Sequence, residues 1–159
     1  MGFIPDKPYL YEKLSAREYL DFVTRIYGTG TKQIEEFADK FGIFENLDQT
    51  VESFSHGMRQ RLVFAATFVH KPEFVVIDEP MVGLDPIASR LVKDFLRNFV
   101  EKGGAILLST HTMSVVEEVA DRISIIKKGS LMETGTLDEI RERALNKGNL
   151  EALFLEITK

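Results

Sequence analysis

The sequence predicts an α/β protein in which a helical first part precedes alternating strands and helices. Residues 74–77 and 105–108 are short, unbroken apolar runs, as expected of parallel strands that are buried on both faces. Between them, Asp85 and Pro86 occupy the favoured cap and first position of a helix that Gly103-Gly104 ends. This strand–helix–strand order favours a parallel sheet covered by helices.

Helices dominate the chain before the first buried strand. Ser15 and Glu18 have the spacing of a capping box, and Ser55 can cap a later helix. The dipeptide Phe3-Ile4 can form a short strand, which the prolines that follow it end. The expected helices cover about residues 15–27, 32–41 and 55–69.

Shorter elements follow the second buried strand. We expect a helix over residues 113–120 and a third buried strand over 123–126, which a turn at 127–130 leads back into 131–133. A capping box at 136–139 opens a helix to about residue 145, and an amphipathic segment follows from Leu150. In the helix that begins at Asp85, apolar residues at every fourth position predict the inward stripe, which is Ile87, Leu91, Phe95 and Phe99.

Composition excludes several kinds of protein. The formal net charge of -5 argues against a nucleic-acid partner, which usually requires a basic patch. Without cysteine, disulfides and thiolate metal sites are excluded. No apolar run approaches the roughly 20 residues that cross a bilayer, and the first ten residues do not form a signal peptide. Because strand-like sequence starts at once, we expect the chain to be cut from a longer protein.

The first motif that carries chemistry is a pair of carboxylates, Asp78 and Glu79, directly after the first buried strand. Open α/β sheets bind ligands at the carboxyl ends of their strands. One carboxylate there can support Mg²⁺, and the next can orient a water for attack on a phosphate. A solvated loop after a strand is the plain structural alternative.

The second motif is the start of the helix that Ser55 caps. A Ser cap followed by Gly57 leaves backbone N–H groups open at the positive end of a helix, which suits a phosphate. Taken alone, this pattern is better explained as a capped surface helix.

Two further motifs follow. His111 comes just beyond the second buried strand, where an imidazole can reach a phosphate, although a lone histidine is more often structural. Residues 83–86 (Gly-Leu-Asp-Pro) have the features of a helix cap.

The order and spacing of these motifs resemble the ABC ATPase family over essentially the whole chain. On that resemblance, residues 55–58 (Ser-His-Gly-Met) fall on the signature motif, Asp78 on the Walker B aspartate and Glu79 on the catalytic glutamate. Leu84-Asp85 falls on the D-loop and His111 on the switch histidine. The resemblance implies a partial P-loop NTPase (RecA-like) parallel sheet with the family's α-helical subdomain.

Three departures from the family pattern matter. Asp6 stands where the family has glutamine, and His56 and Met58 replace the usual Gly and Gln of the signature. No Gly-x-x-x-x-Gly-Lys-[Ser/Thr] sequence occurs, so the first (Walker A) strand and its phosphate-binding loop are absent from the chain. The signature and the C-terminal tail resemble the exporter branch that works with a separate permease.

The resemblance implies the ATP-hydrolysing subunit of an ABC transporter, with ATP and Mg²⁺ as cofactors. Its implied partners are a second ATPase domain, which meets it head to tail around ATP, and a transmembrane permease. It implies a cytoplasmic protein, peripheral on the inner face of the cell membrane. Catalysis is assigned to Glu79 and His111, nucleotide binding to Ser55, His56, Gly57, Met58 and Asp85, and metal binding to Asp78 and Asp6.

The predicted organisation has three parts. Residues 1–72 form the helical subdomain with the signature, 73–135 the α/β core, and 136–159 the C-terminal helices. Two other functions stay open: an ABC ATPase without a permease, as in translation or chromosome maintenance, and a folding unit without activity. We expect the chain alone to be inactive, because it lacks the phosphate loop.

Overall fold

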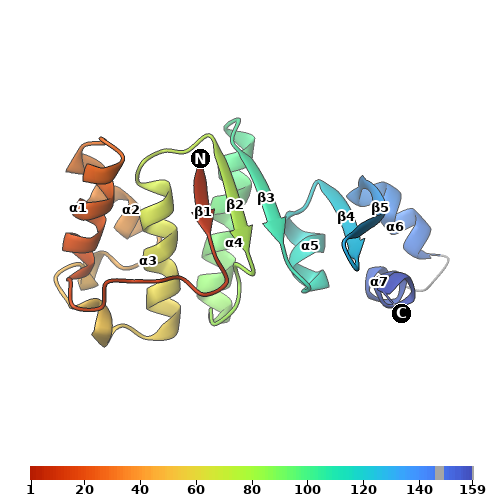
Figure 1. The fold of residues 1–159 in the computed structure, drawn as a ribbon, viewed down its shortest axis with the longest axis horizontal. Helices are drawn as coiled ribbons and strands as arrows, with labels where there is room; N and C mark the ends of the chain where they lie inside the picture. The colour runs from red at the N-terminus through yellow and green to blue at the C-terminus, as the bar shows by residue number, and fades with distance from the viewer. Residues whose placement is uncertain (146–148, 159) are drawn as a thin grey trace. The chain divides into compact units, whose positions relative to one another are not determined.

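The computed structural model describes residues 1–145 and 149–158. They divide into two compact units, Met1–Ser109 and Thr110–Lys159, which are considered separately. Figure 1 shows the helices and strands of both.

Three helices lie between the first and second strands of the first unit. A capping box opens the first of them, since the Ser15 hydroxyl accepts from the Glu18 N–H and the Glu18 carboxylate accepts from the Ser15 N–H. Single-turn 3₁₀ helices lie in the connections, as η1 (Thr31–Gln33), η2 (Phe44–Asn46) and η3 (Val51–Ser53). The three helices are α1 (Ala16–Ile26), α2 (Ile34–Lys40) and α3 (His56–Phe68), close to the predicted ranges.

A three-stranded parallel sheet completes this unit, with β2 (Phe74–Asp78) between β1 (Gly2–Ile4) and β3 (Ala105–Ser109). The crossover from β2 to β3 contains α4 (Pro86–Glu101), which lies against the sheet in Figure 1. The register aligns Ile4 with Ile77, and Ile77 with Leu108. The carboxyl ends of all three strands therefore lie at the same edge of the sheet.

One apolar core joins the helices to one face of the sheet. Ile4, Val75 and Ile77 are fully buried on that face and belong to the same cluster as Phe64 and Phe68 of α3. At about 25 cal/mol per Å² of apolar area, burial of this kind is the main stabilising term. The core fixes α3 beside the strands, and so fixes the start of α3 relative to their ends.

The opposite face of the sheet departs from the prediction of strands buried on both sides. Phe3 is 59% exposed, and so is Leu107 in β3, where no residue is fully buried. The register places Phe3, Val76 and Leu107 in one row on this open face. The apolar runs therefore indicated strands correctly, but not how much of each face is covered.

The predicted stripe of α4 is also displaced. Ile87 is 82% exposed, whereas Ala88, Val92 and Leu96 are the buried residues of the helix. The two stripes are one residue apart, about 100° around the helix. The other predicted residues, Leu91, Phe95 and Phe99, are partly buried beside the true stripe.

The second unit contains α5 (Met113–Val119), the hairpin of β4 (Arg122–Lys127) and β5 (Ser130–Thr136), and the helices α6 (Leu137–Leu145) and α7 (Leu150–Thr158). The expected strand over 123–126 is found as β4, and the predicted turn leads it back into β5, with which it pairs antiparallel in a two-stranded sheet. Contrary to the prediction of a buried strand, Ile125 alone among its described residues is buried. Lys128 and Gly129 both have positive φ (49° and 78°). Two such residues in succession are typical of the tight turn that closes an antiparallel hairpin.

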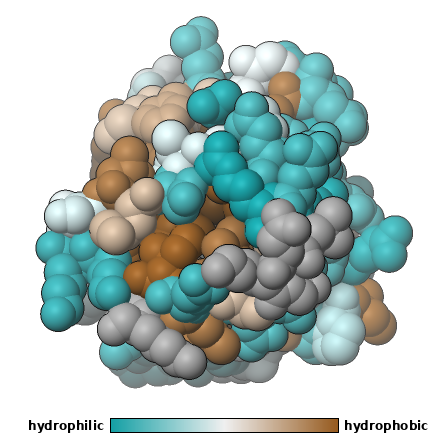
Figure 2. Space-filling model, turned by 90° about the vertical axis from the view of Figure 1, so that its right-hand side faces the viewer, coloured by the Kyte–Doolittle hydropathy of each residue, from teal (hydrophilic) through white to brown (hydrophobic). Residues whose placement is uncertain are grey.

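The second unit has a small core of its own, in which Ile140 and Leu150 are buried. Ile126 and Leu131, which pair across the hairpin, are 65% and 61% exposed. Figure 2 shows apolar surface open to view and bordered by hydrophilic side chains. Among the described helices, none combines the length and the apolar character required to cross a bilayer.

Candidate functional site

The predicted carboxylates lie where adjacent strands end. Asp78 is the last residue of β2, and Asp6 follows β1 by two residues. Because β1 and β2 are parallel neighbours in register, both carboxylates come to the same edge of the sheet. That edge is where open α/β sheets bind ligands.

Glu79 is held in a specific backbone conformation at this edge. Its main-chain N–H donates to the carbonyl oxygen of Ser109, at 2.9 Å, which extends the pairing of β2 and β3 by one residue. Its φ is +47°, in the left-handed region that side chains other than glycine rarely adopt. Strained backbone of this kind gathers at functional sites, where the surrounding structure over-determines it.

The turn that opens α3 has the predicted cap. The Ser55 hydroxyl oxygen accepts from the Met58 N–H at 3.2 Å, and its O–H is still able to donate. Ser55 and His56 are exposed, while Gly57 and Met58 are partly buried. The positive end of a 13-residue helix is thus presented at the surface.

The predicted cap of α4 is confirmed as well. The Asp85 carboxylate accepts from the Ala88 N–H at 2.8 Å, and Pro86 is the first helical residue. Gly83, two residues earlier, has φ +78° and lies against His56. The first unit therefore brings the start of α3 and the start of α4 together, a contact that the sequence did not suggest.

His111 belongs to the second unit, where it is exposed just before α5. Beside it, the Thr112 N–H donates to the Thr110 hydroxyl at 3.1 Å. The role that the family resemblance gives to His111 stays a prediction.

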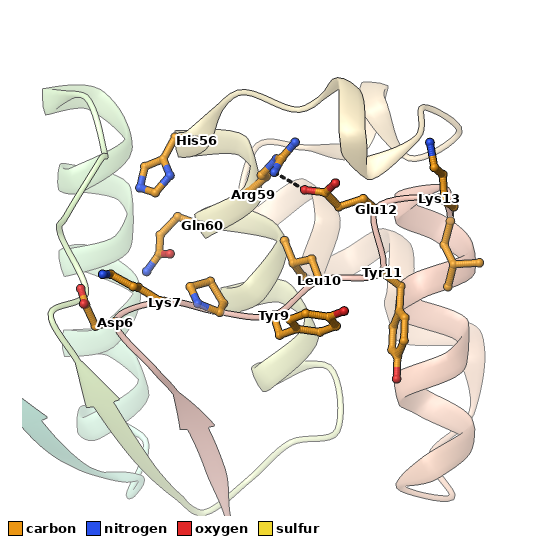
Figure 3. A pocket seen from close by; sticks show the side chains of 12 residues that line it. Asp6, Lys7, Tyr9, Leu10, Tyr11, Glu12, Lys13, His56, Arg59 and Gln60 are labelled. Carbon is orange, nitrogen blue, oxygen red and sulfur yellow. Dashed lines mark hydrogen bonds and ion pairs between the residues drawn. The ribbon is translucent and has the colours of Figure 1, made fainter.

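A groove of about 720 Å³ runs between α3 and the segment that leads from β1 to α1 (Figure 3). Arg59 crosses it, with an ion pair of 2.6 Å to Glu12 and a hydrogen bond of 3.0 Å to the carbonyl of Glu52. Tyr9 is 87% exposed and meets Tyr11 edge to face, with ring centroids 6.2 Å apart. A groove wall with exposed aromatic rings is suited to a protein partner.

Two residues of this groove were not predicted from the sequence. Gln60 is a polar residue only 2% exposed. Arg59 links α3 to Glu12, between β1 and α1, and to the carbonyl of Glu52 in η3. Both lie directly after the signature turn. The sequence held no signal for Gln60, because residues 62–68 of α3 are buried on every side of the helix and form no single inward stripe.

The carboxylates fit a magnesium ion of the kind that binds with a nucleotide. Among the described residues, no three His, Cys, Asp or Glu side chains gather closely enough to form a complete metal site. Mg²⁺ in nucleotide sites is usually held by only one or two carboxylates, with waters and phosphate oxygens as the other ligands. Asp78, at the strand end, is suited to supply such a ligand.

A parallel sheet with paired carboxylates at its carboxyl edge, beside a capped helix end, defines the class of α/β nucleotide-binding proteins. Comparison with known sequences narrows the class: the model of the family described as ABC transporter matches residues 1–82. The chain belongs to the ABC transporter ATP-binding family.

Three relatives show the extent of the similarity. The uncharacterised ABC transporter ATP-binding protein YthP of Bacillus subtilis is 35% identical over 89% of this chain and 62% of its own length. The ABC-type transporter ATP-binding protein EcsA of the same organism is 32% identical over 99% and 66%. The linearmycin resistance ATP-binding protein LnrL, also from B. subtilis, is 33% identical over 90% and 47%. The chain thus spans less than two thirds of the length of each.

The fold is also that of a solved family member. A structure described as the ATP-binding subunit of an ABC transporter matches with a TM-score of 0.88 and 33% identity, over 99% of this chain and 68% of its own. The predicted α/β fold and family are therefore confirmed.

Proposed function

We propose that the chain is part of the ATP-hydrolysing subunit of an ABC transporter, in which ATP binding and hydrolysis drive movement of a permease. The observation that carries this proposal is the edge of the sheet where Asp78 and Glu79 follow β2 directly, next to Asp6 after β1. Adjacent carboxylates at this position suit metal-assisted attack of water on a phosphate.

The two carboxylates have separate roles in this proposal. Mg²⁺, when bound, neutralises charge on the phosphates during transfer. Asp78 holds the ion, and Asp6 is a second candidate ligand. Glu79 orients the attacking water and takes its proton, and His111 stabilises the γ-phosphate. The hydrogen bond from Glu79 to Ser109 supports this role, because it fixes the backbone of the residue that must position the water.

A second ATPase domain completes the site in the proposal. The exposed start of α3, with Ser55, His56, Gly57 and Met58, faces a nucleotide held by that partner. Backbone N–H groups at a helix start bind phosphate without any charged side chain. Asp85 acts from the adjacent loop, where it also caps α4.

The permease docks on the helical part, in the groove of Figure 3. Arg59 and Glu12 form an ion pair across the groove, while Tyr9 and Tyr11 offer exposed aromatic surface. Aromatic side chains are enriched in protein interfaces. Through this contact the subunit acts at the inner face of the cell membrane, on the cytoplasmic side.

A complete ATP-binding subunit of the length of the relatives is the form that tests this proposal. Steady-state phosphate release should require Mg²⁺ and Glu79, and it should rise when a cognate permease is added in lipid nanodiscs. A complete, folded subunit that releases no phosphate in either state would disprove the proposal. The chain alone, without a phosphate-binding loop, should be inactive in the same assay.

A further inference from the structure

The turn that opens α3 touches the loop that leads into α4, and the contact is made by His56. A Cβ atom added to Gly83 would overlap the Cδ2 and Nε2 atoms of the His56 ring. A Cβ atom added to Gly57 would lie 3.2 Å from the carbonyl oxygen of Gly83. The imidazole thus occupies the space that a side chain at position 83 would fill.

Glycine is favoured at position 83 for two independent reasons. Its φ of +78° is strained for any residue with a side chain, and the His56 ring blocks the space besides. Gly103, in the same unit, has φ +93° but nothing within 4 Å of an added Cβ. Comparing substitutions at Gly83 and Gly103 therefore separates the free-energy cost of a side chain at positive φ from the cost of its contact with His56.

The contact joins two capped helix starts. Ser55 caps α3 directly before His56, and Asp85 caps α4 two residues after Gly83. Within the loop, the N–H of Val82 donates to the Glu79 carbonyl and the N–H of Leu84 to the Met81 carbonyl, both at 3.3 Å. These hydrogen bonds are long, so the loop depends on its neighbours for a fixed position.

We propose that His56 is a positioning residue, whose ring holds the loop of residues 82–85 against the start of α3. The inference extends the proposed function, because these two segments are the ones that would face the partner's nucleotide. The ring also lines the groove, so it lies between the loop and the proposed docking surface (Figure 3). A segment with weak hydrogen bonds of its own gains a single conformation from this packing.

Amide hydrogen exchange on the chain, followed by NMR, tests the inference without nucleotide. In His56→Ala, the amides of Val82 and Leu84 should exchange at least tenfold faster than in the unaltered chain. The amide of Glu79, bonded to Ser109, is the internal control and should change less than threefold. Unchanged rates at Val82 and Leu84, or an equal rise at all three amides, would overturn the inference.

A rescue experiment gives a second, independent readout. Gly83→Ala should lower the folding equilibrium constant at least tenfold more than Gly103→Ala, because only Gly83 meets the imidazole. In the His56→Ala background, the cost of Gly83→Ala should fall to within threefold of the Gly103→Ala cost. An equal cost of Gly83→Ala in both backgrounds would show that the ring does not hold the loop. If Gly83→Ala does not fold, the exchange rates decide. Both readouts are independent of ATP hydrolysis, so their failure is distinct from failure of the proposed function.

Discussion

The main-chain N–H of Glu79 donates a hydrogen bond of 2.9 Å to the carbonyl oxygen of Ser109. This bond joins the ends of β2 and β3 where Glu79 takes its unusual φ of +47°. A glutamate at such a position is over-determined by its surroundings, as residues at reaction centres often are. Its side chain is therefore the first target for substitution.

In the complete subunit, Glu79→Gln should lower phosphate release by about 10²-fold or more, within the range typical of a lost general base. ATP should still bind, because the amide keeps the size of the side chain and removes one negative charge near the triphosphate. An ATP-bound dimer should accumulate. Single-turnover phosphate release and size-exclusion chromatography with ATP measure the two effects. Turnover close to that of the unaltered protein would remove Glu79 from the mechanism.

Ser55→Ala separates capping from contact with the partner's nucleotide. Loss of the cap should cost about 1 kcal/mol of stability. Turnover in the complete dimer should fall more than ATP affinity, because in the proposed arrangement the nucleotide that Ser55 faces is held by the partner. Urea unfolding and ATPase kinetics measure the two effects.

Ser15→Ala is the matched control, since Ser15 caps α1 through a hydrogen bond of 3.1 Å from the Glu18 N–H. Ser15→Ala should lower the free energy of unfolding by about 1 kcal/mol, as expected for any lost cap. It should leave turnover unchanged. If Ser55→Ala and Ser15→Ala behave alike in turnover, Ser55 is only a cap.

The sequence was sufficient for features that depend on local patterns. Capping at Ser15, Ser55 and Asp85 was predicted because each cap places its side chain within three residues of its partner. The contact of His56 with Gly83 was not predicted, since it joins residues 27 positions apart by packing alone. The pairing of β4 with β5 was predicted because the turn at 127–130 lies directly between them, but the burial of β4 was overestimated, since an apolar run indicates a strand without showing what covers its faces.

Nucleotide affinity of the chain itself is the next prediction. Most of the binding energy for a triphosphate comes from backbone N–H groups and a lysine on the phosphate loop, and the sequence has no Gly-Lys pair. Asp6, Asp78 and Glu79 add negative charge near the site, which repels phosphate. Titration calorimetry should detect no binding of Mg-ATP at millimolar concentration. Micromolar affinity would contradict this prediction.

Stability should depend on pH through His70. Its ring stacks on Tyr27 with centroids 3.8 Å apart, and burial lowers the pKa of His70 below the usual 6.5. Because the folded chain then binds the proton less readily than the unfolded chain, protonation favours unfolding. The stability that the neutral His70 contributes is therefore fully present above about pH 6.5, and it decreases as the pH falls through that value towards the pKa of His70 in the folded chain.

His70→Phe should keep the stack and remove the titration. Urea midpoints at pH 7.5 and 5.5 should differ less for His70→Phe than for the unaltered chain. The same difference in both proteins would show that other groups cause the pH dependence.

In the described part of the chain, the unpaired edge of strand β3 predicts self-association. Among the described residues, β3 is bonded to β2 along one edge and stands at the end of its sheet. Its sequence from Ala105 to Ser109 has no charge, proline or bulge to block pairing, and Leu107 is 59% exposed. Edges of this kind recruit further strands. Light scattering should therefore give a mass above that of a monomer, increasing with concentration.

Leu107→Lys places a charge on this strand and should shift the chain towards monomer, since lysine is the residue with which natural edge strands prevent pairing. Ile87→Lys is the matched control: it introduces the same charge at a residue 82% exposed on α4, away from the strand, and should leave the mass unchanged. If association instead ran through α4, the two variants would exchange their effects. A strictly monomeric mass of the unaltered chain at high concentration would show that the edge strand β3 does not recruit a second copy.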